Sequence, residues 1–223
     1  MDDGAVPGVF LFEGERQLHS VQLGFALRMV DDALRPASKL ASSVAFEYAG
    51  GVLGGGLDYW KVDLSHDQRW KLREDDEGRK SWLTLAVNGG VSHAFDDTPE
   101  VPPYSRYYAG GRGTIRGFAY RGVGPPADGR PMGGEFLLTG TLEYEMPIAE
   151  DFLSAVAFTD AGTLGTTIAD DDAFRLRLSV GAGIRLKIPG FGDAPLALDF
   201  AVPLLLEEED EKTLISFSLA RDF

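Results

Sequence analysis

Long stretches of strict apolar–polar alternation constrain this chain more than any other feature of its sequence. The clearest stretch covers 173–188, where apolar side chains alternate with arginine, serine, glycine and lysine. A period of two places successive side chains on opposite faces of a β-strand, whereas an amphipathic helix repeats at about 3.6 residues. Nowhere does the helical period last for more than one turn. The chain is therefore expected to be an all-β protein.

Turn-forming residues interrupt the alternation and divide the chain into separate segments. Residues 1–16 are expected to form an N-terminal segment and residues 17–223 a single β-domain. A further short strand is expected at Val9–Glu13. The strands of the domain are expected near 17–30, 38–50, 56–73, 80–95, 133–148, 151–162, 173–188, 195–205 and 212–223.

Alternation by itself fits two kinds of barrel. A soluble ligand-binding barrel turns its apolar face inward, and a membrane barrel turns that face outward to lipid. Strands of ~13–16 residues exceed the 5–6 that are usual in globular sheets. This length favours an antiparallel up-and-down transmembrane β-barrel of about eight to ten strands. The soluble barrel is kept as an alternative.

The composition of the chain excludes several classes of partner and structural feature. The formal net charge of −14 argues against a nucleic-acid partner, whose phosphates need clustered lysine and arginine. The absence of cysteine excludes disulfides and thiolate metal sites. No run of ~18 apolar residues could form a membrane-spanning helix. The acidic segments at 74–77, 96–100, 170–172 and 207–211 are interpreted as solvated loop tips, and the last of them as a tip in preference to a cation site.

No catalytic or cofactor-binding pattern is present. His19, His66 and His93 lack the spacing of metal ligands, and no Gly-x-Ser-x-Gly elbow accompanies a histidine. The glycine runs do not continue into a phosphate-binding loop. The chain is therefore expected not to be an enzyme and to need neither a cofactor nor a metal.

The segment 96–132 is too long for an ordinary hairpin connection and is rich in glycine, proline, tyrosine and arginine. Such a composition favours a packed plug inside a barrel. An arginine placed in the lumen loses hydration and should bind a carboxylate of the inner wall, ideally through a two-pronged hydrogen bond. Glu143 and Asp160 lie on the strands that follow and are the candidate carboxylates for an arginine of this loop.

Four segments in this order resemble the BamA/TamA-type outer-membrane assembly and translocation barrels, also known as the bacterial surface antigen family. They are the loop motif with Gly110, Gly111, Arg116, Gly117 and Phe118, the strand with Gly133-Gly134 before Glu143 and Pro147, the Phe158-x-Asp160-x-Gly162 strand, and the terminal strand Ile215 to Phe223 with Phe217 and Leu219.

The resemblance implies that the loop folds into the barrel and that Arg116 pairs with Asp160 and Glu143. It also implies that Phe158, Val156 and Phe152 face inward with Asp160, leaving small residues for lipid. The terminal strand is similar to the signal that barrel-assembly machinery recognises by strand addition, although Ala220 stands where glycine is usual. A bacterial-type outer membrane, its lipid and that machinery are the implied location and partners.

The chain departs from the family pattern in two ways. It is expected to correspond only to the last strands of a barrel that normally has about sixteen, and to be without the periplasmic repeats. Its Met1-Asp-Asp-Gly start carries no export signal, which is expected to have been removed or replaced. The two sheet edges then require closure within the chain, pairing with another copy, or further strands of a longer protein.

Three functions stay open at this point. The first is insertion or transport of proteins at the outer membrane, with client β-strands as partners. The second is a passive structural or narrow-channel barrel that kept the fold and lost this activity. The third is a soluble ligand-binding barrel.

Overall fold

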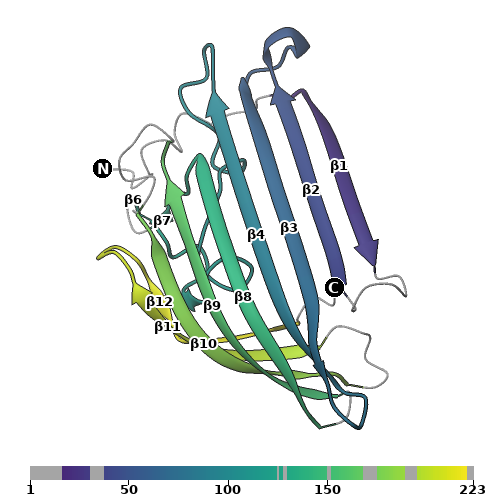
Figure 1. The fold of residues 1–223 in the computed structure, drawn as a ribbon. Helices are drawn as coiled ribbons and strands as arrows, with labels where there is room; N and C mark the ends of the chain where they lie inside the picture. Colours follow the sequence, from purple (N-terminus) through teal and green to yellow (C-terminus); the bar gives the residue numbers. More distant parts are fainter. Residues whose placement is uncertain are drawn as a thin grey trace.

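A single curved antiparallel sheet forms the frame of the protein (Figure 1). The computed structural model describes residues 17–30, 38–124, 126–127, 130–149, 152–167, 175–188 and 195–219. The sheet has nine strands in the order β1-β2-β3-β4-β8-β9-β10-β11-β13. The predicted all-β antiparallel fold is confirmed. The expected strand Val9–Glu13 and the segment 1–16 lie outside the described residues.

The strands of the main sheet lie close to the segments expected from the alternation. Two-stranded pairs outside this sheet involve β5, β6, β7 and β12. The bounds are β1 (Ser20–Val30), β2 (Ser38–Ala49), β3 (Tyr59–Glu74), β4 (Lys80–Ala94), β5 (Gly117–Phe118), β6 (Pro126–Ala127), β7 (Arg130–Pro131), β8 (Phe136–Ala149), β9 (Leu153–Gly165), β10 (Arg177–Leu186), β11 (Leu196–Leu205), β12 (Lys212–Thr213) and β13 (Ile215–Leu219), with a 3-10 turn at Gly51–Leu53.

The main-sheet strands pair in an up-and-down order along the chain. Although residues 95–135 separate β4 from β8, the two strands are neighbours from Trp82↔Glu145 to Val91↔Phe136. The sheet begins at β1 and finishes at β13, and within the described ranges neither of these strands pairs with a further strand of the sheet. The described sheet is thus an open, curved wall with two free edges.

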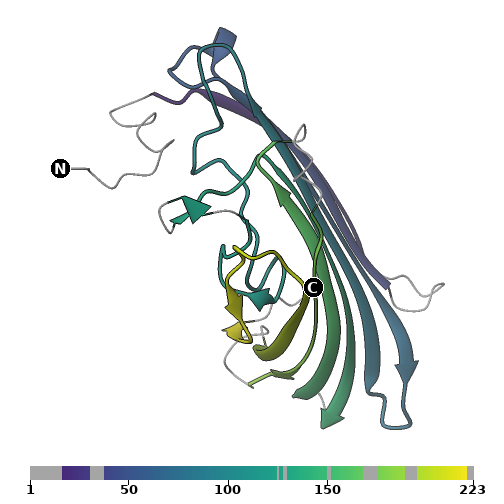
Figure 2. The same cartoon turned by 90° about the vertical axis from the view of Figure 1, so that its left-hand side faces the viewer.

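The two faces of this wall have opposite chemistry. Figure 2 shows the sheet curving around the segment between β4 and β8, which lies on its concave side. Apolar side chains on the convex side are exposed, with Phe25 at 77% and Phe217 at 69% of their full accessible surface. Arg177, Ser179 and Arg185 point to the concave side and are buried. This distribution is the one expected for a membrane barrel and the reverse of that in a soluble barrel.

Across the part of the chain that the structure describes, no helix is long and apolar enough to cross a membrane.

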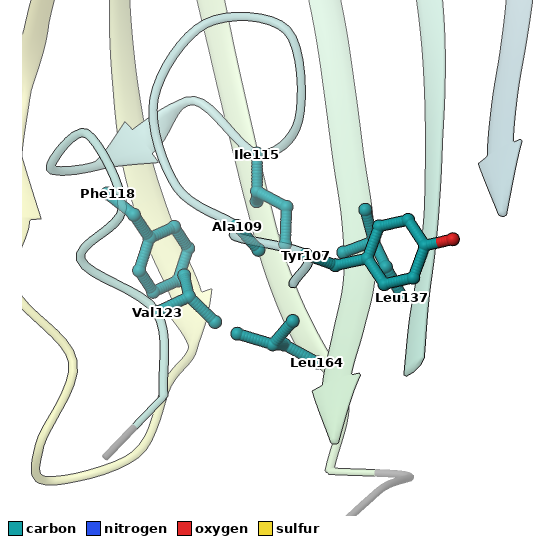
Figure 3. Packing of buried hydrophobic residues seen from close by; sticks show 7 residues of the cluster. All are labelled: Tyr107, Ala109, Ile115, Phe118, Val123, Leu137 and Leu164. Atoms are coloured by element: carbon teal, nitrogen blue, oxygen red, sulfur yellow. The ribbon is translucent and has the colours of Figure 1, made fainter. Parts of the chain in front are cut away.

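The long connection between β4 and β8, here called the in-folded loop (residues 96–132), packs on the concave face. Its apolar side chains form a small core with two residues of the wall, Leu137 of β8 and Leu164 of β9 (Figure 3). The loop contributes Tyr107, Ala109, Ile115, Phe118 and Val123. Burial of this apolar surface holds the loop against the sheet.

Three local expectations need correction. The terminal segment 212–223 is not one continuous strand, because β12 pairs with β5 of the in-folded loop before β13 joins the sheet. The acidic tip 207–211 is not fully solvated, because it folds over the concave face and buries Asp210. Phe152 is 40% exposed because it precedes β9, where the period of two does not yet apply.

Candidate functional site

The arginine motif of the in-folded loop is presented by a compact turn. The backbone N–H of Gly110 donates to Thr114 Oγ1 at 2.9 Å, and that of Gly111 donates to the Ile115 carbonyl at 3.1 Å. Gly110 has a φ of 106°, and a Cβ atom there would lie 2.3 Å from the Ala119 carbonyl oxygen. A larger residue would therefore open the turn that sets the direction of Arg116.

Arg116 binds Asp160 of β9 through a bidentate pair of hydrogen bonds. Its Nε donates to Oδ2 at 2.7 Å and its Nη2 to Oδ1 at 2.8 Å. The backbone N–H of Arg116 also donates to Oδ2, at 2.9 Å. The remaining nitrogen, Nη1, donates to Glu143 Oε2 on β8 at 2.6 Å. These bonds fix the position and orientation of the guanidinium.

Burial and charge act in opposite directions on Arg116. Burial by itself lowers the pKa of the guanidinium, but the hydrogen bonds and charges of Asp160 and Glu143 raise that pKa above its usual value. The side chain keeps only 7% of its accessible surface, and that of Asp160 keeps 1%. The guanidinium therefore stays charged, and its contact with Asp160 is buried inside the protein.

An aromatic ring lies beneath the guanidinium. The Cζ atom of Arg116 is 3.3 Å from the centroid of the Phe158 ring, an arrangement that favours a cation–π interaction. The neighbouring strand makes room for this ring, because a Cβ on Gly181 would lie 2.3 Å from Phe158 Cζ. Phe158 and Val156 face the concave side together with Asp160 and are buried, as the alternation of β9 requires.

The glycine of the Phe158-x-Asp160-x-Gly162 strand serves the packing of the loop. A Cβ on Gly162 would lie 2.8 Å from the Leu138 carbonyl oxygen and 2.9 Å from Ile115 Cδ1. Ile115 directly precedes Arg116 and is fully buried. The absence of a side chain at Gly162 thus allows the loop to approach the wall closely enough for Arg116 to reach Asp160.

Two more arginines and one more carboxylate complete what we call the lock cluster. Arg185 of β10 donates from Nη2 to Glu143 Oε2 at 3.0 Å and from Nη1 to Asp199 of β11. Arg112 of the loop lies with its Nη1 3.6 Å from Asp199 Oδ2. The cluster balances three guanidinium groups against three carboxylates: Arg112, Arg116 and Arg185 with Glu143, Asp160 and Asp199.

The sequence reasoning named Arg116, Asp160 and Glu143 but missed the other three members. Their signal was present: Asp199 is the only charged residue of β11, and Arg185 stands in the alternating segment on the face opposite the apolar residues. Arg112 lies within the loop motif, four positions before Arg116. None of these signals identifies a partner, because the contacts join segments far apart in the chain.

The terminal strand is only partly described. Phe217 lies on the convex face of β13, and Leu219 is the last residue of that strand. Phe223 lies outside the described residues. On the concave face, Ser218 of β13 accepts a hydrogen bond from Arg112 Nη1. The in-folded loop therefore contacts the last strand of the sheet directly.

A family model described as the Omp85 superfamily domain matches residues 10–223. The chain is 27% identical to "Outer membrane protein assembly factor BamA" of Nitratidesulfovibrio vulgaris, covering 100% of this chain and 28% of that protein. It is 26% identical to "Sorting and assembly machinery component 50 homolog A" of Xenopus laevis, covering 88% of this chain and 44% of that protein. It thus spans less than half of either relative.

A solved structure supports the fold alone. The crystal structure of BamA from Haemophilus ducreyi lacking POTRA domains 1–3 superposes with a TM-score of 0.73 at 21% sequence identity. The match covers 89% of this chain and 41% of that one. The open nine-stranded wall therefore corresponds to part of a larger known fold.

Proposed function

The chain belongs to the Omp85 superfamily, and from that premise we propose that it is an outer-membrane β-barrel domain that inserts proteins into the outer membrane or transports them across it. The relatives named as assembly factors motivate the activity. The convex apolar face supports the location, because lipid-facing residues of such barrels are apolar while lumen-facing residues are polar. Outer-membrane lipid and unfolded client strands are then its partners.

The observation that carries the proposal is the lock cluster between the in-folded loop and the wall. A buried ionic network adds little net stability, since removing charges from water opposes the gain from pairing them. Its geometry instead fixes one arrangement of the loop: Arg116 contacts Asp160 and Glu143 on two adjacent strands. A passive barrel has no evident need for an ionic network that holds its loop in one arrangement.

The free sheet edges supply the chemistry for client recognition. Backbone N–H and C=O groups at an edge go unsatisfied in lipid, and each such group is costly. A client segment in extended conformation satisfies these groups by adding a strand. In this proposal β1 or β13 acts as the template, and the lock cluster holds the strands from β8 to β11, which lead up to β13, in place while the client strand pairs.

The test is client assembly in lipid vesicles. Vesicles that carry the purified protein are given an unfolded small barrel protein, and the folded fraction is followed by its altered migration on unheated gels. We expect faster folding than in empty vesicles, and loss of this acceleration in Arg116→Ala. The matched control is Arg121→Ala, which removes an exposed arginine of the same loop that stacks on Tyr108 and lies outside the lock cluster.

Two results would decide against assembly activity. The first is a wild-type protein that accelerates client folding no more than an inert barrel does at equal density. The second is an Arg116→Ala variant that stays fully active although its loop is displaced. Either result favours the passive structural or narrow-channel barrel. For that second function the present geometry offers little space, because the loop occupies the concave side.

A further inference from the structure

The tip between β11 and β13 folds back over the in-folded loop. β12 in this tip pairs with β5, joining Lys212 to Phe118 and Thr213 to Gly117. The backbone N–H of Ala119 donates to the Glu211 carbonyl at 2.8 Å. The arginine motif is therefore covered by the last hairpin as well as held by the wall.

A second buried ion pair fastens this tip. Arg177 of β10 donates from Nε to Asp210 Oδ2 at 3.0 Å and from Nη2 to Oδ1 at 3.2 Å. The side chains keep 2% and 0% of their accessible surface. Asp210 also accepts the backbone N–H groups of Gly124 at 3.0 Å and Glu207 at 2.8 Å. The carboxylate thus joins the wall, the in-folded loop and the tip.

This pair is separate from the lock cluster. It shares no residue with that cluster, and the tip that it holds leads directly into β13, which begins at Ile215. The described part of β13 pairs with β11 from Leu196↔Leu219 to Phe200↔Ile215. The tip therefore holds the chain on the in-folded loop directly before it enters this pairing.

We propose that Arg177 and Asp210 are positioning residues that hold the tip of the last hairpin on the in-folded loop, and so control how often β13 leaves its place in the wall. We call this pair the hairpin latch. It holds the chain just before the start of the strand, and the Arg112–Ser218 contact holds the strand further along. Any role of the latch in strand addition rests on the proposed function, whereas its effect on the position of β13 does not.

The absence of cysteine from the chain makes a labelling test specific. Ser216→Cys places a single thiol on β13, on the concave side beside Asp199. The rate of its reaction with a water-soluble maleimide is measured in the full chain in lipid vesicles. In Asp210→Asn and in Arg177→Gln we expect this rate to rise at least about tenfold, which corresponds to ~1.4 kcal/mol of easier local opening. Arg177→Lys keeps the charge without the two-pronged bond and should give a smaller rise.

Two controls separate the latch from general loss of structure. Glu207→Gln removes a partly exposed ion pair with Arg175 in the same tip, and it should leave the rate unchanged. A thiol at buried Ser92 of β4 should also react at its wild-type rate in the latch variants. The latch is overturned if the maleimide reaction rate at Ser216→Cys is unchanged in the latch variants, or if the rate rises equally at both thiols.

Client folding measured on the same samples reports separately on the proposed function. If the latch substitutions speed the reaction at Ser216→Cys but the wild-type protein does not accelerate client folding, the latch is supported and assembly activity is rejected. If the wild-type protein accelerates client folding but the labelling rate at Ser216→Cys does not respond to Asp210→Asn, the latch is rejected and assembly activity is retained.

Discussion

Arg116 and the carboxylate of Asp160 are joined by three hydrogen bonds across 44 positions of sequence, two from the guanidinium and one from the backbone N–H of Arg116. Both groups are buried, so neither has water to replace its partner. Neutralising Asp160 leaves the buried guanidinium with Glu143 as its remaining hydrogen-bonded carboxylate, and it leaves the lock cluster with three guanidinium groups against two carboxylates. The loop and the wall are therefore energetically coupled at this point.

Asp160→Asn is expected to lower the free energy of unfolding by about 3–5 kcal/mol, the range for breaking a buried ion pair by removing one partner. Urea titration of the protein in lipid vesicles measures the change. Glu77→Gln is the control, because that side chain is 71% exposed and its pair with Arg79 should contribute ~0–1 kcal/mol. Equal effects of the two substitutions would contradict the coupling.

Gly162→Ala should displace the in-folded loop. The added Cβ would lie 2.8 Å from the Leu138 carbonyl oxygen, a backbone atom that cannot move freely. We expect a loss of roughly 1–3 kcal/mol, as for other overpacked sites, with faster proteolysis of the loop. Gly140→Ala on the adjacent strand is the matched control, since its nearest neighbour would be 3.9 Å away. A stable Gly162→Ala protein with an intact loop would refute the packing argument.

The two faces of the wall should respond differently to charge. Leu142→Arg near the middle of β8 places a guanidinium on the convex apolar face and should cost about 2–4 kcal/mol of folding free energy in a bilayer. Ser43→Arg lies near the middle of β2 on the concave side and should cost much less. The measurement is the folded fraction in lipid vesicles over a urea series. A similar loss for both variants would argue against a lipid-facing convex surface.

The 223-residue chain expressed by itself should not be a closed single-chain barrel. A barrel of about eight strands has an interior just filled by its own side chains, which leaves no room for the in-folded loop. We therefore expect pairing of β1 and β13 between copies, and a protein mass in detergent greater than one chain by light scattering. A monomer with heat-modifiable gel migration would show that the strands close alone and that the loop has left the interior.

Most of the strand positions follow from local patterning. The alternation around 133–148 and 173–188 predicts strands that agree closely with β8 and β10, because side-chain period depends only on neighbouring residues. The order of the strands in the main sheet follows their order in the chain, and the long connection between β4 and β8 does not interrupt it. Even the paired candidates Arg116 and Asp160 could be named in advance, since their motifs stand in a recognisable order.

By itself, then, the sequence determined the β-strands, which side chains share a face of the sheet, and the residues that carry the loop motif. Only the tertiary structure decided that Asp210, in an acidic run that reads as a solvated tip, is buried against Arg177. It also decided that Asp199 and Arg185 join the lock cluster. The physical reason is that an ion pair depends on the distance between two charges and on the water around them, and both are set by curvature and loop packing that no local pattern contains.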